Sequence, residues 1–170
     1  MKALIISIIF SCIASLSLNA QEVYNTIHTK AKETVENPNT ASVLRDFNQF
    51  KVDALDYLLI KMREQMPDST VSFLDKQALA LNNFMNLYTS NILQLRNEPK
   101  VYMIEVVKIF MDASYSNPLF NDADKDLVMT YYSNGDSMTR FSLDTDWQRA
   151  YVAASFELKK WKENGKAVTK

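Results

Sequence analysis

The chain has 170 residues, and its 19 Lys and Arg against 20 Asp and Glu give a net charge of −1 at pH 7. A balance this close to neutral leaves no electrostatic footprint for nucleic acid, so we expect no nucleic-acid partner. Only 2 Gly and 4 Pro occur, which are too few for the many turns of an all-β protein of this length. The composition therefore favours a helical fold.

The first 20 residues are typical of a secretory signal peptide. Lys2 gives a basic start, an apolar run follows over residues 3–18, and the small residue Ala20 precedes a polar stretch. The apolar run is shorter than the ~20 residues that a transmembrane helix needs. We therefore predict a bacterial protein exported to the periplasm or the extracellular space, with no membrane span after signal cleavage.

Cys12 offers a second interpretation of the same segment. Residues 9–12, Ile-Phe-Ser-Cys, loosely fit a lipoprotein signal, which would make Cys12 an acylated amino terminus. Residues 13–18 are still apolar, whereas a lipoprotein tether is normally polar, so soluble export is favoured and acylation stays open. Cleavage after Ala20 removes the only cysteine, which excludes disulfides, a thiol nucleophile and a thiolate metal site. Export without disulfides suits a bacterial periplasm.

Helical periodicity organises the chain from residue 22 to residue 96. Apolar residues recur every three or four positions over 22–36 and 41–66, and Pro38 and Pro67 follow these two stretches. The strongest pattern alternates steps of three and four at Val71, Leu74, Ala78, Leu81, Met85, Tyr88, Ile92 and Leu95. A neighbouring line widens this seam into a core face at Phe73, Ala80, Phe84 and Leu87. The short link at 67–70 predicts that the helices on either side of it are antiparallel.

The flanks of the seam also carry polar residues. Gln77 and Asn91 fall on the line of Phe73 and Phe84. We expect these two amides to mark where the core face meets water or a polar partner.

The remaining elements follow Pro99. The stretch 100–115 is apolar nearly all round, so we expect it to be the most enclosed helix. Further helices are predicted at 123–133 and at 145–163, the last capped by Asp144 and ended by the Asn-Gly pair at 164–165. Between them, the least regular residues Met138, Phe141 and Leu143 are expected to pack as an extended segment. The fold class is all-α, a single bundle of five to six helices, mostly antiparallel, over residues 21–165, with a frayed tail at 166–170.

His28 is the only histidine, and it lies at the edge of the apolar stripe of 22–36. Nothing near it resembles a nucleophile motif, and a packing or solvated role is favoured. A di-iron carboxylate site needs Glu-x-x-His on two helices, whereas Asn25 stands three positions before His28. Haem ligation by His28 with a methionine is disfavoured, because these methionines lie at core positions: Met66, Met85, Met103 and Met111. We predict no cofactor.

Several acidic residues are spaced so that their carboxylates lie on one side of a helix, as a catalytic or metal-binding pair would. Asp53 and Asp56 form a carboxylate pair at helical spacing, which indicates a solvated face. Glu105 and Asp112 lie on the one polar strip of 100–115, with Lys108 between them as an oppositely charged neighbour. That strip is expected to face solvent, and an enzyme that uses one of these acids is the third hypothesis.

The alternating acids Asp122, Asp124 and Asp126 mimic the start of a calcium loop. The match then fails, because Leu127 stands where the loop needs a glycine and Ser133 where it needs a bidentate Glu. An acidic first turn at the positive end of a helix explains the acids. Weak calcium binding at these residues stays open, and we predict no metal site, no catalytic residue and no phosphate-binding loop.

Four segments are similar to small exported helical proteins of Bacteroides-type bacteria. They are the Leu-Asn-Ala-Gln-Glu of residues 18–22, the residues 50–55 together with 63–71, and the Phe-Met-Asp-Ala-Ser of 110–114. The likeness covers most of the chain after the signal peptide. It implies the compartment and the fold, and it adds no activity and no site residue.

Two hypotheses on function follow. The first is an exported, non-enzymatic interaction or structural module with an unknown protein partner, which should show a contiguous exposed apolar patch. The alternative is a periplasmic carrier that encloses a small apolar ligand among the methionines and aromatic residues of 71–115. A carrier should show a closed apolar cavity of several hundred Å³.

Overall fold

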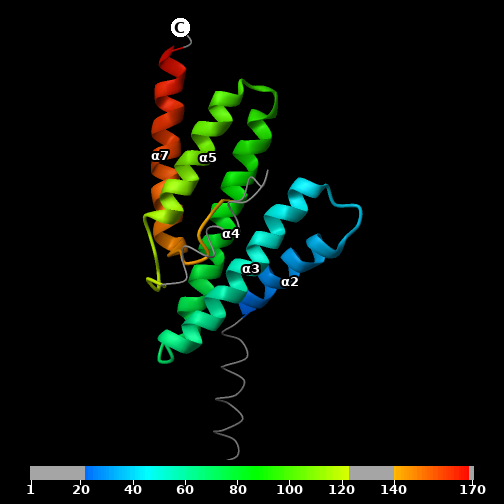
Figure 1. Ribbon diagram of the computed structural model, residues 1–170, viewed down its shortest axis with the longest axis vertical. Helices are drawn as coiled ribbons and strands as arrows, with labels where there is room; N and C mark the ends of the chain where they lie inside the picture. The colour runs from blue at the N-terminus through cyan, green and yellow to red at the C-terminus, as the bar shows by residue number, and fades with distance from the viewer. Residues whose placement is uncertain (1–21, 123–139, 169–170) are drawn as a thin grey trace, which may run out of the picture.

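The computed structural model describes residues 22–122 and 140–168, with the backbone alone for residues 165–168. Within these ranges the chain forms five α-helices and one 3-10 turn, and no strand (Figure 1). The elements are α2 (Glu22–Glu36), α3 (Ser42–Gln65), α4 (Val71–Gln94), η1 (Leu95–Asn97), α5 (Lys100–Tyr115) and α7 (Trp147–Val168). The all-α prediction is confirmed for this part of the chain. The predicted signal peptide, Cys12, the helix expected at 123–133 and Met138 lie outside the described residues.

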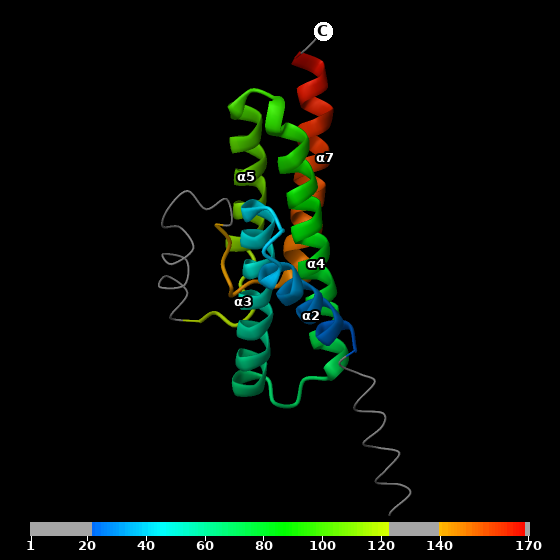
Figure 2. The ribbon, with the colours of Figure 1, turned by 90° about the vertical axis from the view of Figure 1, so that its right-hand side faces the viewer.

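Helix α4 is the centre of the bundle. It contacts α2, α3, α5 and α7, while α2 also packs on α3 and α5 also packs on α7. Figure 1 shows α2 and α3 beside the first half of α4, and α5 and α7 beside its second half. Figure 2, turned by 90°, shows α7 alongside α4. The turn at 66–70 reverses the chain, so α3 and α4 are antiparallel, as the sequence predicts.

The seam on α4 faces the core. Its buried residues are Leu74, Ala78, Leu81, Met85, Tyr88 and Ile92 on the first line, and Ala80 and Phe84 on the second. Each of these side chains has 8% or less of its surface exposed. The two-line pattern predicted this, because a helix that contacts four neighbours must bury a wide face.

Aromatic rings from α4, α5, α7 and the segment before α7 form one cluster in the core. Phe84 lies edge-on to Phe110 of α5 at 5.0 Å and to Trp147 of α7 at 5.4 Å between ring centroids. Phe141, in the segment before α7, lies edge-on to Tyr88 at 4.9 Å and is fully buried. Such edge-to-face pairs stabilise a core beyond the burial of apolar surface alone. Phe141 is thus one residue of the expected extended segment that packs against the helices.

The expectation that 100–115 is the most enclosed helix is wrong. Only Val106, Phe110, Ala113 and Ser114 of α5 are buried, whereas α4 has ten buried residues. Val101 and Ile104 of α5 are 51% and 66% exposed. The reason is position: within the described residues α5 packs on α4, α7 and η1, so much of its apolar surface faces outward.

The predicted end of the last helix is also wrong. Helix α7 continues past the Asn-Gly pair at 164–165 to Val168. A glycine in a helix interior costs only about 1 kcal/mol relative to alanine, and no proline follows to stop the helix.

Candidate functional site

Asp144 organises the loop that follows α5. Its carboxylate is buried and accepts three backbone N–H groups: Oδ1 from Leu119 at 3.0 Å and Phe120 at 2.8 Å, and Oδ2 from Asp122 at 3.0 Å. Hydrogen bonds to a charged acceptor are about twice as strong as neutral ones, which offsets the desolvation of the carboxylate. The prediction that Asp144 caps the last helix is therefore wrong, because its acceptors face the 119–122 loop.

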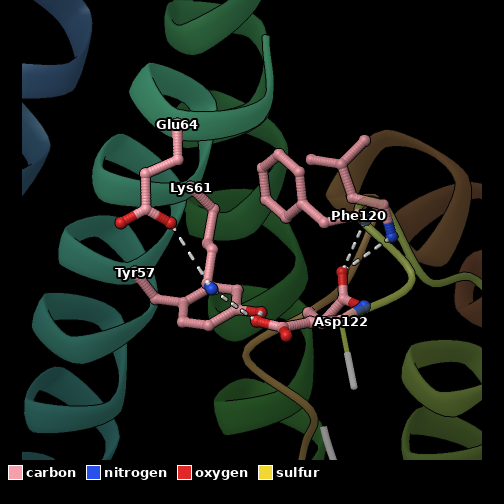
Figure 3. Close-up of polar contacts among 7 residues, drawn as sticks. Tyr57, Lys61, Glu64, Phe120 and Asp122 are labelled. Carbon is pink, nitrogen blue, oxygen red and sulfur yellow. Dashed lines mark hydrogen bonds and ion pairs between the residues drawn. The ribbon is translucent and has the colours of Figure 1, made fainter. Parts of the chain in front are cut away.

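Asp122 ties the same loop to α3. Its Oδ2 accepts a hydrogen bond from the Tyr57 hydroxyl at 2.8 Å. The same oxygen forms an ion pair with Lys61 Nζ, also at 2.8 Å (Figure 3). Lys61 also lies 3.5 Å from Glu64. The hydrogen bond to Asp122 raises the pKa of Lys61. Asn121, just before, has φ 58°, a left-handed conformation that Asn tolerates better than most residues.

The calcium prediction rests partly on Asp122. Asp122 is engaged by a tyrosine hydroxyl and a lysine ammonium, and an ammonium at 2.8 Å repels a divalent cation. Asp124 and Asp126 lie outside the described residues. Weak calcium binding therefore stays a prediction with no support from Asp122.

Asp146, two residues after Asp144, provides the cap of α7. Its Oδ1 accepts the backbone N–H of Arg149 at 3.3 Å and the side-chain amide of Gln77 at 3.0 Å. Gln77 in turn accepts the backbone N–H of Trp147 at 2.8 Å. Gln77 is 1% exposed. Of the two surroundings expected for its amide, water or a polar partner, it has the second, because it bonds to Asp146 and to the backbone of Trp147. This exchange fixes the start of α7 against α4.

Lys51 is a buried amine that the sequence analysis did not single out. It lies on α3, 9% exposed, and its Nζ donates to the side-chain oxygens of Asn82 at 3.2 Å and Asn86 at 3.1 Å on α4. Burial lowers its pKa. The available signal was its position on the buried stripe, four residues after Phe47 and four before Leu55.

His28 joins α2 to α3. Its Nε2 lies 3.0 Å from Asp56 Oδ1, and its ring stacks on Tyr24 with centroids 5.8 Å apart. Burial raises the pKa of Tyr24 to about 12. Asp53, the other acid of the predicted pair, accepts a hydrogen bond from Gln49 at 2.8 Å. These contacts join α2 to α3 and link successive turns within each helix.

Glu105 and Asp112 of α5 have different surroundings. Glu105 accepts a hydrogen bond from the indole N–H of Trp161 at 2.7 Å, which joins α5 to α7. Asp112 is exposed. Over residues 22–122 and 140–164 no group of three or more His, Cys, Asp or Glu side chains could hold a metal ion.

A groove runs between α4 and α7. Its volume is about 320 Å³, and its lining residues are Leu87, Tyr151, Ser155, Leu158, Lys159, Lys162 and Glu163. The groove opens to solvent, unlike the closed cavity that the carrier hypothesis expects. The rings around Phe84 pack against one another in the core.

The outward side of α7 carries two large apolar residues that are exposed. Val152 and Phe156, one turn apart, are 67% and 66% exposed. They lie opposite the side that packs on the bundle, where Ala150, Ala154 and Leu158 are buried. We define the outer face of α7 as the row of Arg149, Val152, Phe156, Lys160 and Glu163.

The outer face of α7 was not predicted from the sequence. The stripe of α7 at Trp147, Tyr151, Ala154, Leu158 and Trp161 accounts for the core contact. Val152 and Phe156 fall on the opposite side of the helical wheel, spaced four apart, and that second apolar line was the signal.

A comparison of the chain with protein-family models, with curated proteins and with solved structures finds no match. Among the described residues no helix has the length and apolar character needed to cross a membrane.

Proposed function

We propose that this chain is an exported, non-enzymatic helical interaction module that binds its partner through the outer face of α7. The observation that carries the proposal is the exposure of Val152 and Phe156, about two-thirds of each side chain, on a helix whose other side is in the core. Full burial of one such side chain contributes ~1.5–3 kcal/mol. A partner that covers both residues would bury apolar surface that is exposed to water in the folded chain, and this burial would stabilise the complex.

Contacts with α4 and α5 hold α7 in place, which favours a binding role for its outer face. Gln77 holds its first turn through Asp146 and Trp147, and Glu105 holds Trp161 further along. The outer face is therefore presented on a helix fixed at two places. A preorganised surface loses little conformational entropy when a partner binds.

The compartment in the proposal comes from the first 20 residues. Their basic start, apolar run and small residue at the exit are the pattern of a cleaved export signal. The absence of cysteine after residue 20 agrees with a bacterial periplasm.

The groove between α4 and α7 supports a second candidate function. Apolar side chains of Leu87, Tyr151 and Leu158 line it together with Ser155 and the charged Lys159, Lys162 and Glu163, which suits a ligand with an apolar part and a polar end. This is the carrier hypothesis in an altered form, with the ligand lying in an open groove.

Photo-crosslinking tests the main proposal. Phe156 is replaced by p-benzoylphenylalanine in the bacterial cells that make the protein, and the same replacement at Ile60, 53% exposed on α3, is the matched control. We expect discrete crosslinked adducts from position 156 on irradiation and few or none from position 60. No adduct at 156, or the same adducts from both positions, would contradict a binding role for the outer face.

A further inference from the structure

We propose that the partner of the outer face of α7 is a second copy of this chain, bound through an antiparallel pair of α7 helices with a two-fold axis at Phe156. The inference deepens the proposed function and rests on it, because it needs the outer face to be a binding surface. The spacing and the charges along this face point to a second copy of the chain.

The spacing of the outer face is symmetric about Phe156. Steps of three, four, four and three residues separate Arg149, Val152, Phe156, Lys160 and Glu163. A two-fold axis through Phe156, perpendicular to the helix, places each residue opposite the one equally far on the other side of residue 156 in the second copy. Phe156 then meets Phe156, Val152 meets Lys160, and Arg149 meets Glu163.

The charges at the two ends select the antiparallel orientation. Arg149 and Glu163 each lie seven residues from Phe156, or about 10 Å along the helix axis. In an antiparallel pair each Arg149 faces a Glu163 of the other copy, which gives two ion pairs of opposite charge. A parallel pair would place Arg149 against Arg149 and Glu163 against Glu163, and like charges repel.

Both end residues are available for such pairs. The side chain of Arg149 is 76% exposed and that of Glu163 is 66% exposed. Their contacts within the chain are pairs on the helix surface, Arg149 with Asp146 at 3.3 Å and Glu163 with Lys159 at 4.0 Å. Exposed pairs of this kind contribute about 0–1 kcal/mol, so they compete little with a partner.

The central contact is apolar. The two Phe156 rings would meet at the axis, and the aliphatic stem of Lys160 would cover Val152 while its ammonium stays in water. Because the face spans about four helical turns, the interface is smaller than the ~1,200–2,000 Å² of a stable complex. We therefore expect a weak, reversible dimer with a dissociation constant on the order of 100 µM.

Charge reversal gives a sharp test, because the two single variants complement each other. Arg149→Glu places Glu opposite Glu at both ends of its own dimer, and Glu163→Arg places Arg opposite Arg. A mixture of the two variants restores both pairs of opposite charge. Sedimentation equilibrium between 10 and 500 µM should show the wild-type protein associating, each variant alone associating at least tenfold more weakly, and the mixture regaining the wild-type affinity.

Controls separate association from folding. Lys108→Glu reverses an exposed charge on α5, away from the outer face, and should leave the wild-type association unchanged. Circular dichroism melting should show all variants folded, since the altered side chains are exposed. A wild-type protein that stays monomeric at 500 µM overturns the inference, and so does a mixture that associates no better than its components.

The crosslinking experiment tells the two proposals apart. An adduct from position 156 with twice the mass of the chain supports the second copy. An adduct with a different protein, together with a monomeric purified chain, leaves the proposed function standing and overturns this inference. The absence of any adduct overturns both.

Discussion

Asp122 and Lys61 form an ion pair at 2.8 Å that joins the loop after α5 to the second half of α3. The Asp122 side chain is 9% exposed and also accepts the hydroxyl of Tyr57. The backbone N–H of Asp122 points the other way, to the buried carboxylate of Asp144. One short loop is thus held on both sides, by side chains of α3 and by the segment that leads into α7 (Figure 3).

We expect Asp144→Asn to destabilise the protein by ~3 kcal/mol. The amide removes the charge and leaves a single acceptor oxygen for three backbone N–H donors, and its own NH₂ then faces at least one of them. Urea unfolding at pH 7 measures the change. Asp112→Asn, an exposed position, is the matched control and should change the free energy of unfolding by less than 0.5 kcal/mol. Equal effects at the two positions would contradict an anchoring role for Asp144.

Lys51→Met should alter how stability depends on pH. The pKa of Lys51 is lowered by burial, so below that pKa the folded state bears the full cost of a desolvated ammonium. Between the lowered pKa and the ordinary value of 10.5 the unfolded chain holds more protons than the folded one, and wild-type stability gains with rising pH. The variant lacks this gain while its side chain still fills the space.

Urea unfolding at several values between pH 7 and pH 10.5 measures the effect. The free energy of unfolding of wild type minus that of Lys51→Met should increase as the pH rises through this window. Lys32→Met, at a position where the side chain is 61% exposed, should show no such increase. A difference that stays constant with pH would mean that burial does not disfavour the charged amine.

The sequence predicted most of the fold because its signals are local. The apolar residues of the seam on α4 alternate strictly between steps of three and four. Prolines or an Asn-Pro turn separate the helices, so α2 and α5 begin and end where the pattern places them. The enclosure of α5 was predicted wrongly because an apolar composition does not say how many neighbours a helix has. That information lies in tertiary packing alone.

The polar network was less predictable than the helices. Asp144 and Asp146 both lie just before α7, and aspartate is a common helix cap, so the sequence alone does not distinguish them. Asp146 caps the helix, whereas Asp144 binds the 119–122 loop because the fold places that loop beside it. Lysine usually lies at the surface, so the sequence does not indicate that Lys51 is buried. Its ammonium is accommodated by hydrogen bonds to Asn82 and Asn86 on another helix. The outer face of α7 could have been found from sequence, by plotting Val152 and Phe156 on the helical wheel.

The central claim is that the outer face of α7 serves association with a second copy and contributes nothing to the fold. The most direct test is Phe156→Ser, with sedimentation equilibrium and urea unfolding measured on the same preparation. We predict a protein that stays monomeric to 500 µM while its free energy of unfolding at low concentration lies within about 0.5 kcal/mol of wild type. A variant that associates as the wild type does, or one that loses several kcal/mol of stability, would contradict the claim.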